Sequence, residues 1–399
     1  RLCYLGKPKE KRTKKKLMNS PKEKTENLIK LFLVTAKDIR TVLIKLADRY
    51  YNMQTLGALP EKDQKRIALE TLEIYAPIAN RLGMGELKGQ LEDLAFKYLY
   101  PKEYARLENE MVERYETHKN YIKKLTPVIY EILKNENIIP LEINARSKYF
   151  YSLYKKLLRY QMNFDKIHDL VAARIIVKNI EDCYLTLGAI HQVWKPVPGL
   201  IKDYISMPKP NGYQSLHTSV FGPEGKITEI QIRTPEMHAK AENGIAAHWA
   251  YKERNYKDKN RYPKIDTKEI IWIEQLRERQ KVAKSSDEFP ESLKIDFFKD
   301  RIFVLTPQGD IIDLPEGATP VDFAYQVHTT VGHECAGALV NEKITSLDAK
   351  LESGDLVEIM TQKGKKPSAD WLNFVKTSLA KDRIRSVLKE KNKKLSFRT

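Results

Sequence analysis

The apolar residues change their spacing along the chain, and this change limits the possible folds more than any other feature. From Lys24 to about Met162 they recur every three or four positions, which indicates amphipathic helices. Beyond Phe164 the pattern changes to short β-branched runs separated by proline and glycine, at 172–177, 218–221 and 227–232. The sequence therefore predicts a helical part followed by a mixed α/β part. Its 399 residues are enough for two or three domains.

A third unit follows a charged stretch at 251–268. Residues 269–283 are expected to form a helix and residues 285–288 a linker. Residues 302–314 then contain two apolar runs around Pro307-Gln308-Gly309-Asp310, which predicts a β-hairpin. Thr319-Pro320 opens an amphipathic helix that continues through Tyr325. A small α+β module of about 60 residues is expected here.

The charge balance points to phosphate-bearing partners. The chain carries 70 Lys and Arg against 53 Asp and Glu, a net charge of +17. Such a field attracts nucleotides, RNA or anionic lipid, although a basic protein without these partners has the same composition. The three cysteines stand far apart, which argues against a cysteine metal site and for a reducing cytoplasm. No apolar run is long enough to span a membrane, so no membrane partner is expected.

Residues 203–217 (DYISMPKPNGYQSLH) are the most informative stretch. Two prolines and an Asn-Gly turn restrict its backbone. Within nine residues the stretch supplies a cation, an amide, an aromatic ring and an imidazole, from Lys209, Asn211, Tyr213 and His217. These are the groups that a purine nucleotide pocket requires. The alternative is an ordinary surface turn with polar residues.

A second stretch, 146–156 (RSKYFYSLYKK), is basic. Lys148, Ser152 and Lys156 are four residues apart, so on a helix they lie along one face. Two lysines with a hydroxyl between them suit a polyphosphate. A solvated amphipathic face produces the same pattern.

Two carboxylates stand beside predicted strands. Asp169 precedes the run that starts at Val171. Glu229 lies within ITEIQIR, where strand alternation places Glu229, Gln231 and Arg233 on one face and the isoleucines between them on the other. A carboxylate beside phosphate-binding lysines can hold Mg²⁺, which takes one or two carboxylates together with substrate phosphates. The alternative for each carboxylate is a salt bridge.

Several motifs together resemble the RelA/SpoT homologues, the long bacterial (p)ppGpp synthetase/hydrolases. The synthetase domain of that family is resembled by DYISMPKPNGYQSLHT (203–218), EIQIRT (229–234) and GIAAHWAYK (244–252). Upstream, KLADRYYNMQTL (45–56) and YAPIANRLGM (75–84) continue the resemblance. Downstream, residues 292–363 resemble a TGS domain, a small β-grasp fold, and DWLNFVKTS (370–378) follows it.

The resemblance implies a multidomain α and α+β protein. Its expected parts are a C-terminal remnant of a helical HD hydrolase domain at 1–64, a helical connector at 65–125, a mixed α/β nucleotidyltransferase-like synthetase domain at 126–284, the TGS domain at 292–363, and the start of a further helical region at 364–399. The chain begins with arginine rather than methionine, and we expect it to be a fragment of a longer protein.

The activity implied by the resemblance is that of a GTP pyrophosphokinase of the stringent response. The 3′-hydroxyl of GTP or GDP attacks the β-phosphorus of ATP, which gives (p)ppGpp and AMP. The resemblance assigns ATP binding to five positions, namely Arg146, Lys148, Ser152, Lys156 and, as a weaker candidate, Arg174.

The resemblance also implies a metal and an acceptor site. Asp169 would bind Mg²⁺, and Glu229 would bind the metal or act as the base on the 3′-hydroxyl. Tyr213 would stack on guanine. The other acceptor-site residues are Lys202, Lys209, Asn211 and His217.

Two positions depart from the family pattern. Leu200-Ile201-Lys202-Asp203 follows the R-x-K-D motif of the bifunctional members except that Leu200 replaces the arginine, which leaves the preference between GTP and GDP open. Asp48, with Asn52 beside it, matches the last metal ligand of the HD hydrolase. The first histidine of the sequence is His118, so no imidazole precedes Asp48, and we expect no hydrolase activity from these residues.

The TGS-like module suggests an RNA partner. It resembles a domain that touches the 3′ end of uncharged tRNA on the ribosome, and His328 and His333 are the candidates for that contact. The alternative is that these histidines cap or pack a helix. The expected partners are thus ATP, GTP or GDP, the ribosome and uncharged tRNA. A catalytically silent regulator that binds RNA or the ribosome is the competing hypothesis.

Overall fold

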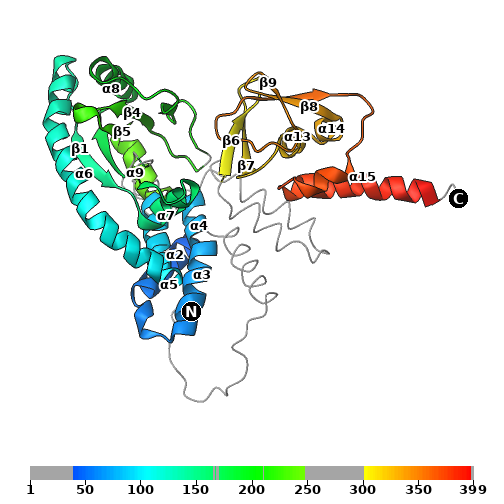
Figure 1. Ribbon diagram of the computed structural model, residues 1–399, viewed down its shortest axis with the longest axis horizontal. Coiled ribbons are helices and arrows are strands. Elements are labelled where there is room, and N and C mark those ends of the chain that lie inside the picture. The colour runs from blue at the N-terminus through cyan, green and yellow to red at the C-terminus, as the bar shows by residue number, and fades with distance from the viewer. Residues whose placement is uncertain (1–38, 165–166, 168–169, 210, 248–300, 397–399) are drawn as a thin grey trace, which may run out of the picture. The chain divides into compact units, whose positions relative to one another are not determined.

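A computed structural model describes residues 39–164, 167, 170–209, 211–247 and 301–396 (Figure 1). Asp169 and the expected helix and linker at 269–283 and 285–288 lie outside these residues. These residues include the helical part, the strands after Phe164 and the third module. Among them, no helix is long and apolar enough to cross a membrane.

The first part of the structure is helical, as predicted. Its α-helices are α2 (Ile39–Gln54), α3 (Glu61–Glu70), α4 (Ala76–Arg81), α5 (Gly85–Leu99) and α6 (Pro101–Asn135). A single turn of π-helix, Thr71–Tyr75, joins α3 to α4. Apolar residues with the predicted three- and four-residue spacing, such as Leu46, Ile78 and Leu91, are buried. Burial of this stripe, rather than helix propensity alone, holds short helices such as α4 in place.

The prediction of helix as far as Met162 was wrong at one segment. Residues Glu142–Ser147 form strand β1, and helix α7 (Phe150–Arg159) follows it. Helix α6 ends at Asn135, and Asn137 adopts a left-handed φ of 56°, which turns the chain out of the helix. β1 then pairs along its whole length with β2, and this pairing, rather than the local apolar spacing, determines its conformation.

The second part contains a five-stranded sheet in the order β1-β2-β5-β4-β3. The remaining strands are β2 (Val171–Ile176), β3 (Lys202–Asp203), β4 (Leu216–Phe221) and β5 (Ile227–Arg233). β2 and β5 are parallel, and the other neighbouring pairs are antiparallel. Three of these strands were predicted to within two residues at their starts, because their β-branched runs are bounded by turn residues.

The two faces of the sheet differ sharply. One face is apolar, carries residues such as Ile175, Val220, Ile230 and Ile232, and packs against α6 and α8 (Ile180–Val193) (Figure 1). The other face carries polar and charged side chains. Strand alternation produces this division, because successive side chains point to opposite faces. The helices on the apolar side leave the polar side to form a site.

The third part is a small α+β domain. Hairpin β6 (Arg301–Leu305) and β7 (Ile311–Pro315) is followed by α13 (Pro320–Val327) and α14 (Thr329–His333). The remaining elements are the three-stranded sheet of β8 (Cys335–Val340), β9 (Lys343–Thr345) and β10 (Val357–Thr361), in the order β10-β8-β9, and helix α15 (Ser378–Ser396). The predicted hairpin and the helix at Thr319-Pro320 are confirmed. The fold class, a helical region with a mixed α/β domain and a small α+β domain, is also confirmed.

A buried carboxylate joins the helix of this domain to the segment that follows it. Asp322 is fully buried and closes a capping box with Thr319 at the start of α13. It also accepts hydrogen bonds from the backbone N–H groups of Lys376, at 3.0 Å, and Thr377, at 2.7 Å. The Thr377 hydroxyl donates to the same carboxylate at 2.8 Å and accepts from the N–H of Ala380 in α15. One side chain thus fixes the starts of two helices.

Replacement of Asp322 by alanine should release the start of α15. Each buried donor left without a partner costs about 1–3 kcal/mol, so the free energy of unfolding should fall by at least that amount. Hydrogen–deuterium exchange should become faster at Lys376 and Thr377. Asp370→Ala, which removes an exposed carboxylate that interacts with Ser368, is the matched control. Unchanged protection in Asp322→Ala would contradict this role.

Candidate active site

A row of polar residues crosses the whole sheet on its polar face. The strand register pairs Asn144 of β1 with Arg174 of β2, Arg174 with Gln231 of β5, Gln231 with His217 of β4, and His217 with Lys202 of β3. Residues that are directly paired have side chains on the same face, a few ångströms apart. The register therefore gathers residues from five strands that are far apart in the sequence.

Glu229 lies at the centre of this face. The predicted alternation of β5 is confirmed, since Ile230 and Ile232 are in the core while the Glu229 side chain is 17% exposed on the polar side. The Nε2 atom of Gln231 donates to Glu229 Oε1 at 2.9 Å. His217 Nδ1 lies 3.1 Å from the same oxygen. Two donors from neighbouring strands therefore converge on one carboxylate oxygen.

The hydrogen bonds of His217 define its tautomer. A carboxylate can only accept, so Nδ1 carries the proton that is donated to Glu229. The other ring nitrogen, Nε2, lies 2.7 Å from the Tyr213 hydroxyl, which can donate to it. Burial lowers the pKa of His217 below its usual value, which favours this neutral form. The imidazole thereby connects the Tyr213 ring to the Glu229 carboxylate.

An aromatic corner with a cation lies next to His217. The rings of Tyr204 and Tyr213 pack edge-on, with centroids 6.0 Å apart, and Tyr204 packs edge-on against His217 at 5.3 Å. The Lys209 ammonium lies 4.5 Å from the centre of the Tyr204 ring and 5.2 Å from that of Tyr213. Burial, together with the nearby cations Lys202, Lys88 and Arg146, lowers the pKa of Lys209 to about 8. An anion bound here would relieve that repulsion.

The loop that carries Lys209 and Tyr213 is tied to the helical part. The Asn211 side-chain amide donates to the carbonyl oxygen of Asn80 in α4 at 3.0 Å, and its Oδ1 accepts from the Tyr213 N–H at 3.2 Å. Gly83, in the turn between α4 and α5, has a φ of 73°, and a Cβ there would lie 2.9 Å from the Asn211 carbonyl oxygen. Only glycine allows this close approach.

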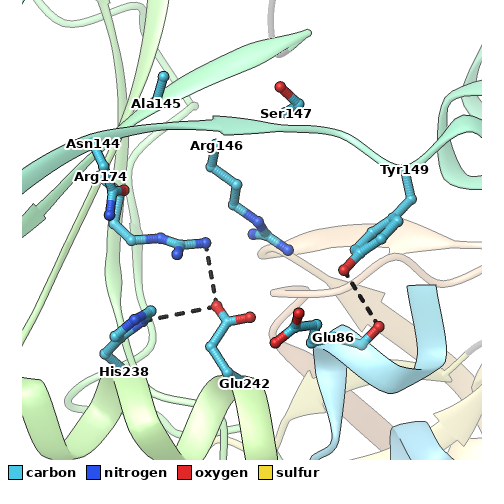
Figure 2. A pocket seen from close by; sticks show the side chains of 9 residues that line it. All are labelled: Glu86, Asn144, Ala145, Arg146, Ser147, Tyr149, Arg174, His238 and Glu242. Carbon is cyan, nitrogen blue, oxygen red and sulfur yellow. Dashed lines mark hydrogen bonds and ion pairs between the residues drawn. The ribbon is translucent and has the colours of Figure 1, made fainter. Parts of the chain in front are cut away.

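A pocket of about 420 Å³ opens beside the row, at the β1 edge of the sheet (Figure 2). Figure 2 shows Arg146 projecting into it between Arg174 and Tyr149. Arg146 NH1 also donates to Gln231 Oε1 at 3.3 Å, so the pocket is connected to the Glu229 cluster. The residues that line it are Glu86, Asn144, Ala145, Arg146, Ser147, Tyr149, Arg174, His238 and Glu242.

Glu242 holds the cations on the far side of this pocket. One of its oxygens lies 3.2 Å from Arg174 NH2, 3.3 Å from Arg233 NH2 and 3.8 Å from His238 Nδ1. Both arginines are buried, and burial lowers the pKa of Arg233 to about 10. Removal of one partner of a buried ion pair leaves an uncompensated charge, so Glu242 stabilises both arginines here. Glu242 and His238 were not predicted from the sequence, although their i, i+4 spacing on α9 (Pro235–Asn243) places them on one helical face.

The prediction that Lys148, Ser152 and Lys156 share a helical face was wrong for Lys148. Helix α7 begins at Phe150, so Lys148 lies between the end of β1 and the helix. Asp93 of α5 sets this start, since its carboxylate accepts from the N–H groups of Phe150 and Tyr151 at 3.1 and 2.9 Å.

The remaining two members of that set are on α7. The Ser152 hydroxyl donates to Glu92 of α5 at 3.4 Å, while Lys156 lies one turn further along α7. The serine therefore holds α7 against α5 in this structure.

Lys202 and Asp203, the last two residues of the motif at 200–203, form strand β3 at the far edge of the sheet. Lys202 is exposed on β3, opposite His217, whereas Asp203 accepts from the N–H groups of Ile205 and Ser206 and from the Tyr184 hydroxyl. Asp203 thus stabilises the turn that leads into the loop carrying Lys209 and Tyr213. Leu200 is 39% exposed before this strand.

The other predicted residues lie in other parts of the fold. Asp48 and Asn52 are exposed on α2. His328 is exposed and accepts the Thr330 N–H at its Nδ1, so it caps α14, and His333 packs edge-on against the Tyr325 ring. Contact of these histidines with RNA stays a prediction.

The fold and the site define a protein in which an α/β domain with a polar sheet face is joined to a helical part and a small α+β domain. Comparison with known protein families agrees with this domain arrangement. The model described as "Region found in RelA / SpoT proteins" matches residues 145–256, an HD-domain model matches residues 5–85, and the TGS-domain model matches residues 302–361. The first match contains residues 145–147 of β1, the polar row except Asn144, and the pocket arginines Arg146 and Arg174. The third match covers the small domain.

Curated relatives align with most of this chain. The chain is 47% identical over 380 residues to the GTP pyrophosphokinase of Myxococcus xanthus, an alignment that covers 95% of this chain and 49% of the relative. It is 47% identical over 373 residues to the guanosine-3′,5′-bis(diphosphate) 3′-pyrophosphohydrolase of Aquifex aeolicus, with 93% and 52% covered. For the bifunctional (p)ppGpp synthase/hydrolase SpoT of Escherichia coli the identity is 46% over 376 residues, with 94% and 53% covered.

The chain belongs to the RelA/SpoT family. It spans about half the length of the curated relatives it matches.

Replacement of Gly83 by alanine should disturb the 209–213 loop. The left-handed backbone and the close Asn211 carbonyl make the new Cβ costly, so the free energy of unfolding should fall by more than about 1 kcal/mol. Exchange of the Tyr213 amide should become faster. Gly188→Ala is the matched control, since a Cβ there meets nothing within 4 Å and alanine favours the helix. If the two variants had the same free energy of unfolding and the same exchange rate at Tyr213, Gly83 would not be needed to hold the 209–213 loop.

Proposed function

We propose that the chain is a GTP/GDP 3′-pyrophosphokinase, which transfers pyrophosphate from ATP to the 3′-hydroxyl of GTP or GDP and releases AMP. The single observation that carries the proposal is the position of Glu229. Its carboxylate lies at the centre of the polar sheet face, between an arginine-lined pocket and a lysine–tyrosine corner. That arrangement suits a base that must reach a hydroxyl held between two phosphate-bearing substrates.

The donor side is proposed to be the pocket at the β1 edge. Arg146 and Arg174 supply fixed positive charge there, and guanidinium groups suit both phosphates and the faces of aromatic rings. Lys148, Ser152 and Lys156, which follow β1 directly, complete the proposed ATP-binding set. Transfer of a phosphoryl-type group depends chiefly on positioning and charge neutralisation, so a cationic pocket is the main requirement.

The acceptor side is proposed to be the corner around Tyr213. Its ring offers a stacking surface for guanine, and base–aromatic stacking contributes about 1–3 kcal/mol. Lys209 and Lys202 supply charge for the acceptor phosphates, with Asn211 and His217 beside the ring. Names of relatives support this assignment, since the one from Myxococcus xanthus is a GTP pyrophosphokinase.

In the proposed reaction, one bond forms and one bond breaks at the β-phosphorus of ATP. The 3′-oxygen attacks the β-phosphorus of ATP, the bond from that phosphorus to the oxygen bridging to the α-phosphate breaks, and AMP leaves. The proton of the 3′-hydroxyl passes to the Glu229 carboxylate. The packed rings of Tyr204, Tyr213 and His217 would shield this path on one side.

Magnesium is the cofactor proposed for this site. Among the described residues no three His, Cys, Asp or Glu side chains cluster closely enough to hold a metal ion. Mg²⁺ does not need such a cluster, since it binds through one or two carboxylates with waters and substrate phosphates. With Glu229 acting as the base, Asp169 would hold the ion, which would neutralise charge on the transferred phosphates.

Two further proposals concern the flanking domains. The HD-type residues Asp48 and Asn52 are not accompanied by any histidine in the matched range 5–85, so we propose that these 399 residues do not hydrolyse (p)ppGpp. The TGS domain, with His328 and His333, is proposed to contact uncharged tRNA on the ribosome.

Glu229→Gln should abolish pyrophosphate transfer and leave the fold intact. The amide keeps the volume of the side chain but cannot take the proton. AMP release from ATP with GTP or GDP and Mg²⁺ should fall at least about 100-fold, in the range of removing a general base. Binding of each nucleotide, measured by calorimetry, confirms that the variant is folded. Turnover at the wild-type rate would remove Glu229 from the reaction.

The affinity for the acceptor nucleotide should depend on pH through Lys209. Anions bind the charged ammonium, whose pKa of about 8 in the free protein means that it loses its proton as the pH rises through that value. GDP affinity should therefore be flat below pH 7 and fall up to about 10-fold per pH unit well above pH 8. Lys209→Arg keeps its charge and should remove this dependence. Calorimetric titrations from pH 6.5 to 9.5 compare the two proteins, and parallel curves would exclude Lys209 as the cause.

A further inference from the structure

Gln231 lies between Arg146 and Glu229, and the proposed reaction assigns it no contact with either nucleotide. Its side chain is buried, with 4% of the residue exposed. Its Oε1 accepts from Arg146 NH1 at 3.3 Å, and its Nε2 donates to Glu229 Oε1 at 2.9 Å. A side-chain amide can accept from a guanidinium and donate to a carboxylate at once, whereas an ionised carboxylate only accepts and an ammonium only donates.

His217, on the neighbouring strand β4, makes a second contact with Glu229. His217 lies directly opposite Gln231 in the β4–β5 register, on the same face as Glu229. Its Nδ1 donates to Glu229 Oε1 and its Nε2 accepts from the Tyr213 hydroxyl. The sheet register thus brings two donors, one from β4 and one from β5, to the same oxygen of Glu229.

We propose that Gln231 and His217 are positioning residues that hold the Glu229 carboxylate, and that the hydrogen-bonded chain Arg146–Gln231–Glu229–His217–Tyr213 links the two nucleotide sites through it. The inference rests on the proposed function, because that function gives Glu229 the reacting hydroxyl. It adds that the hydroxyl of Tyr213 acts separately from its stacking ring.

The hydrogen-bonded chain determines how the Glu229 carboxylate responds when the two substrates bind. Its two ends are the groups proposed to contact ATP and guanine, and its middle is the carboxylate that both donors orient. A nucleotide that moves Arg146 or Tyr213 therefore changes hydrogen bonds that reach Glu229. Small shifts of a base relative to its substrate change rates strongly, so both nucleotides contribute to its final orientation.

The kinetic test uses two variants of the full chain. Gln231→Met keeps the side-chain length but removes both hydrogen bonds, and kcat should fall about 10-fold or more while KM for each nucleotide changes less than about twofold. Tyr213→Phe keeps the ring, so GDP affinity should be retained while kcat falls about threefold or more. Gln64→Met, which removes amide hydrogen bonds to the carbonyls of Gly57 and Leu59 instead, should have no effect.

A change in KM alone, or wild-type kcat in both variants, would overturn the inference. A structural role in the fold would instead change the free energy of unfolding and both kinetic constants together. Absence of transfer activity in the wild-type protein would refute the proposed function. In that case a spectroscopic measurement on His217 would still show whether the hydrogen bonds between these side chains exist.

That readout is the ¹⁵N resonances of the His217 ring, assigned with His217→Asn. The structure predicts a protonated Nδ1 and an Nε2 that accepts a hydrogen bond in the wild-type protein. Tyr213→Phe should shift the Nε2 resonance toward that of a free imidazole nitrogen, and Gln231→Met should shift Nδ1. Resonances that do not respond to either substitution would show that these side chains are not linked.

Discussion

The register of the five-stranded sheet is the constraint on which the candidate site depends. A slip of one residue in the pairing of β4 or β5 would turn His217 or Glu229 into the apolar core and bring isoleucines to the surface. Burial of the apolar face under α6 and α8 prevents that slip. The same hydrophobic packing that stabilises the domain therefore also aligns the polar row, and chemistry and stability are properties of opposite faces of one sheet.

The helical part does more than precede the sheet in the chain. Asp93 of α5 caps α7, and Asn80 of α4 holds the loop with Lys209 and Tyr213 through the Asn211 amide. Asp93 is partly buried at this contact, and burial raises the pKa of its carboxyl to about 6. The elements proposed to bind the two nucleotides are thus positioned in part by helices outside the sheet, so movement of those helices would reach both proposed sites.

Local patterns in the sequence predicted much of this arrangement, and tertiary pairing accounts for the rest. Alternation in ITEIQIR was sufficient to place Glu229 and Gln231 on one face, and the hairpin and helix of the small domain followed from turn and capping residues. Strand β1 was missed although Ile143 and Ala145 alternate with polar residues, because the segment is short and lies between two helices, and its pairing with β2 establishes it as a strand. Glu242 was missed since its role depends on Arg174 and Arg233, which reach it through the fold.

The most direct test of the central claim follows the pyrophosphoryl group itself. Purified chain is incubated with ATP labelled at the β-phosphate, GTP or GDP, and Mg²⁺, and products are resolved by anion-exchange chromatography. The proposed function predicts that label moves to the guanosine nucleotide as AMP appears in equal amount, and comparison of the two acceptors shows the effect of Leu200. Absence of transfer, with ribosomes and uncharged tRNA also present, would contradict the account and favour a regulator that only binds RNA.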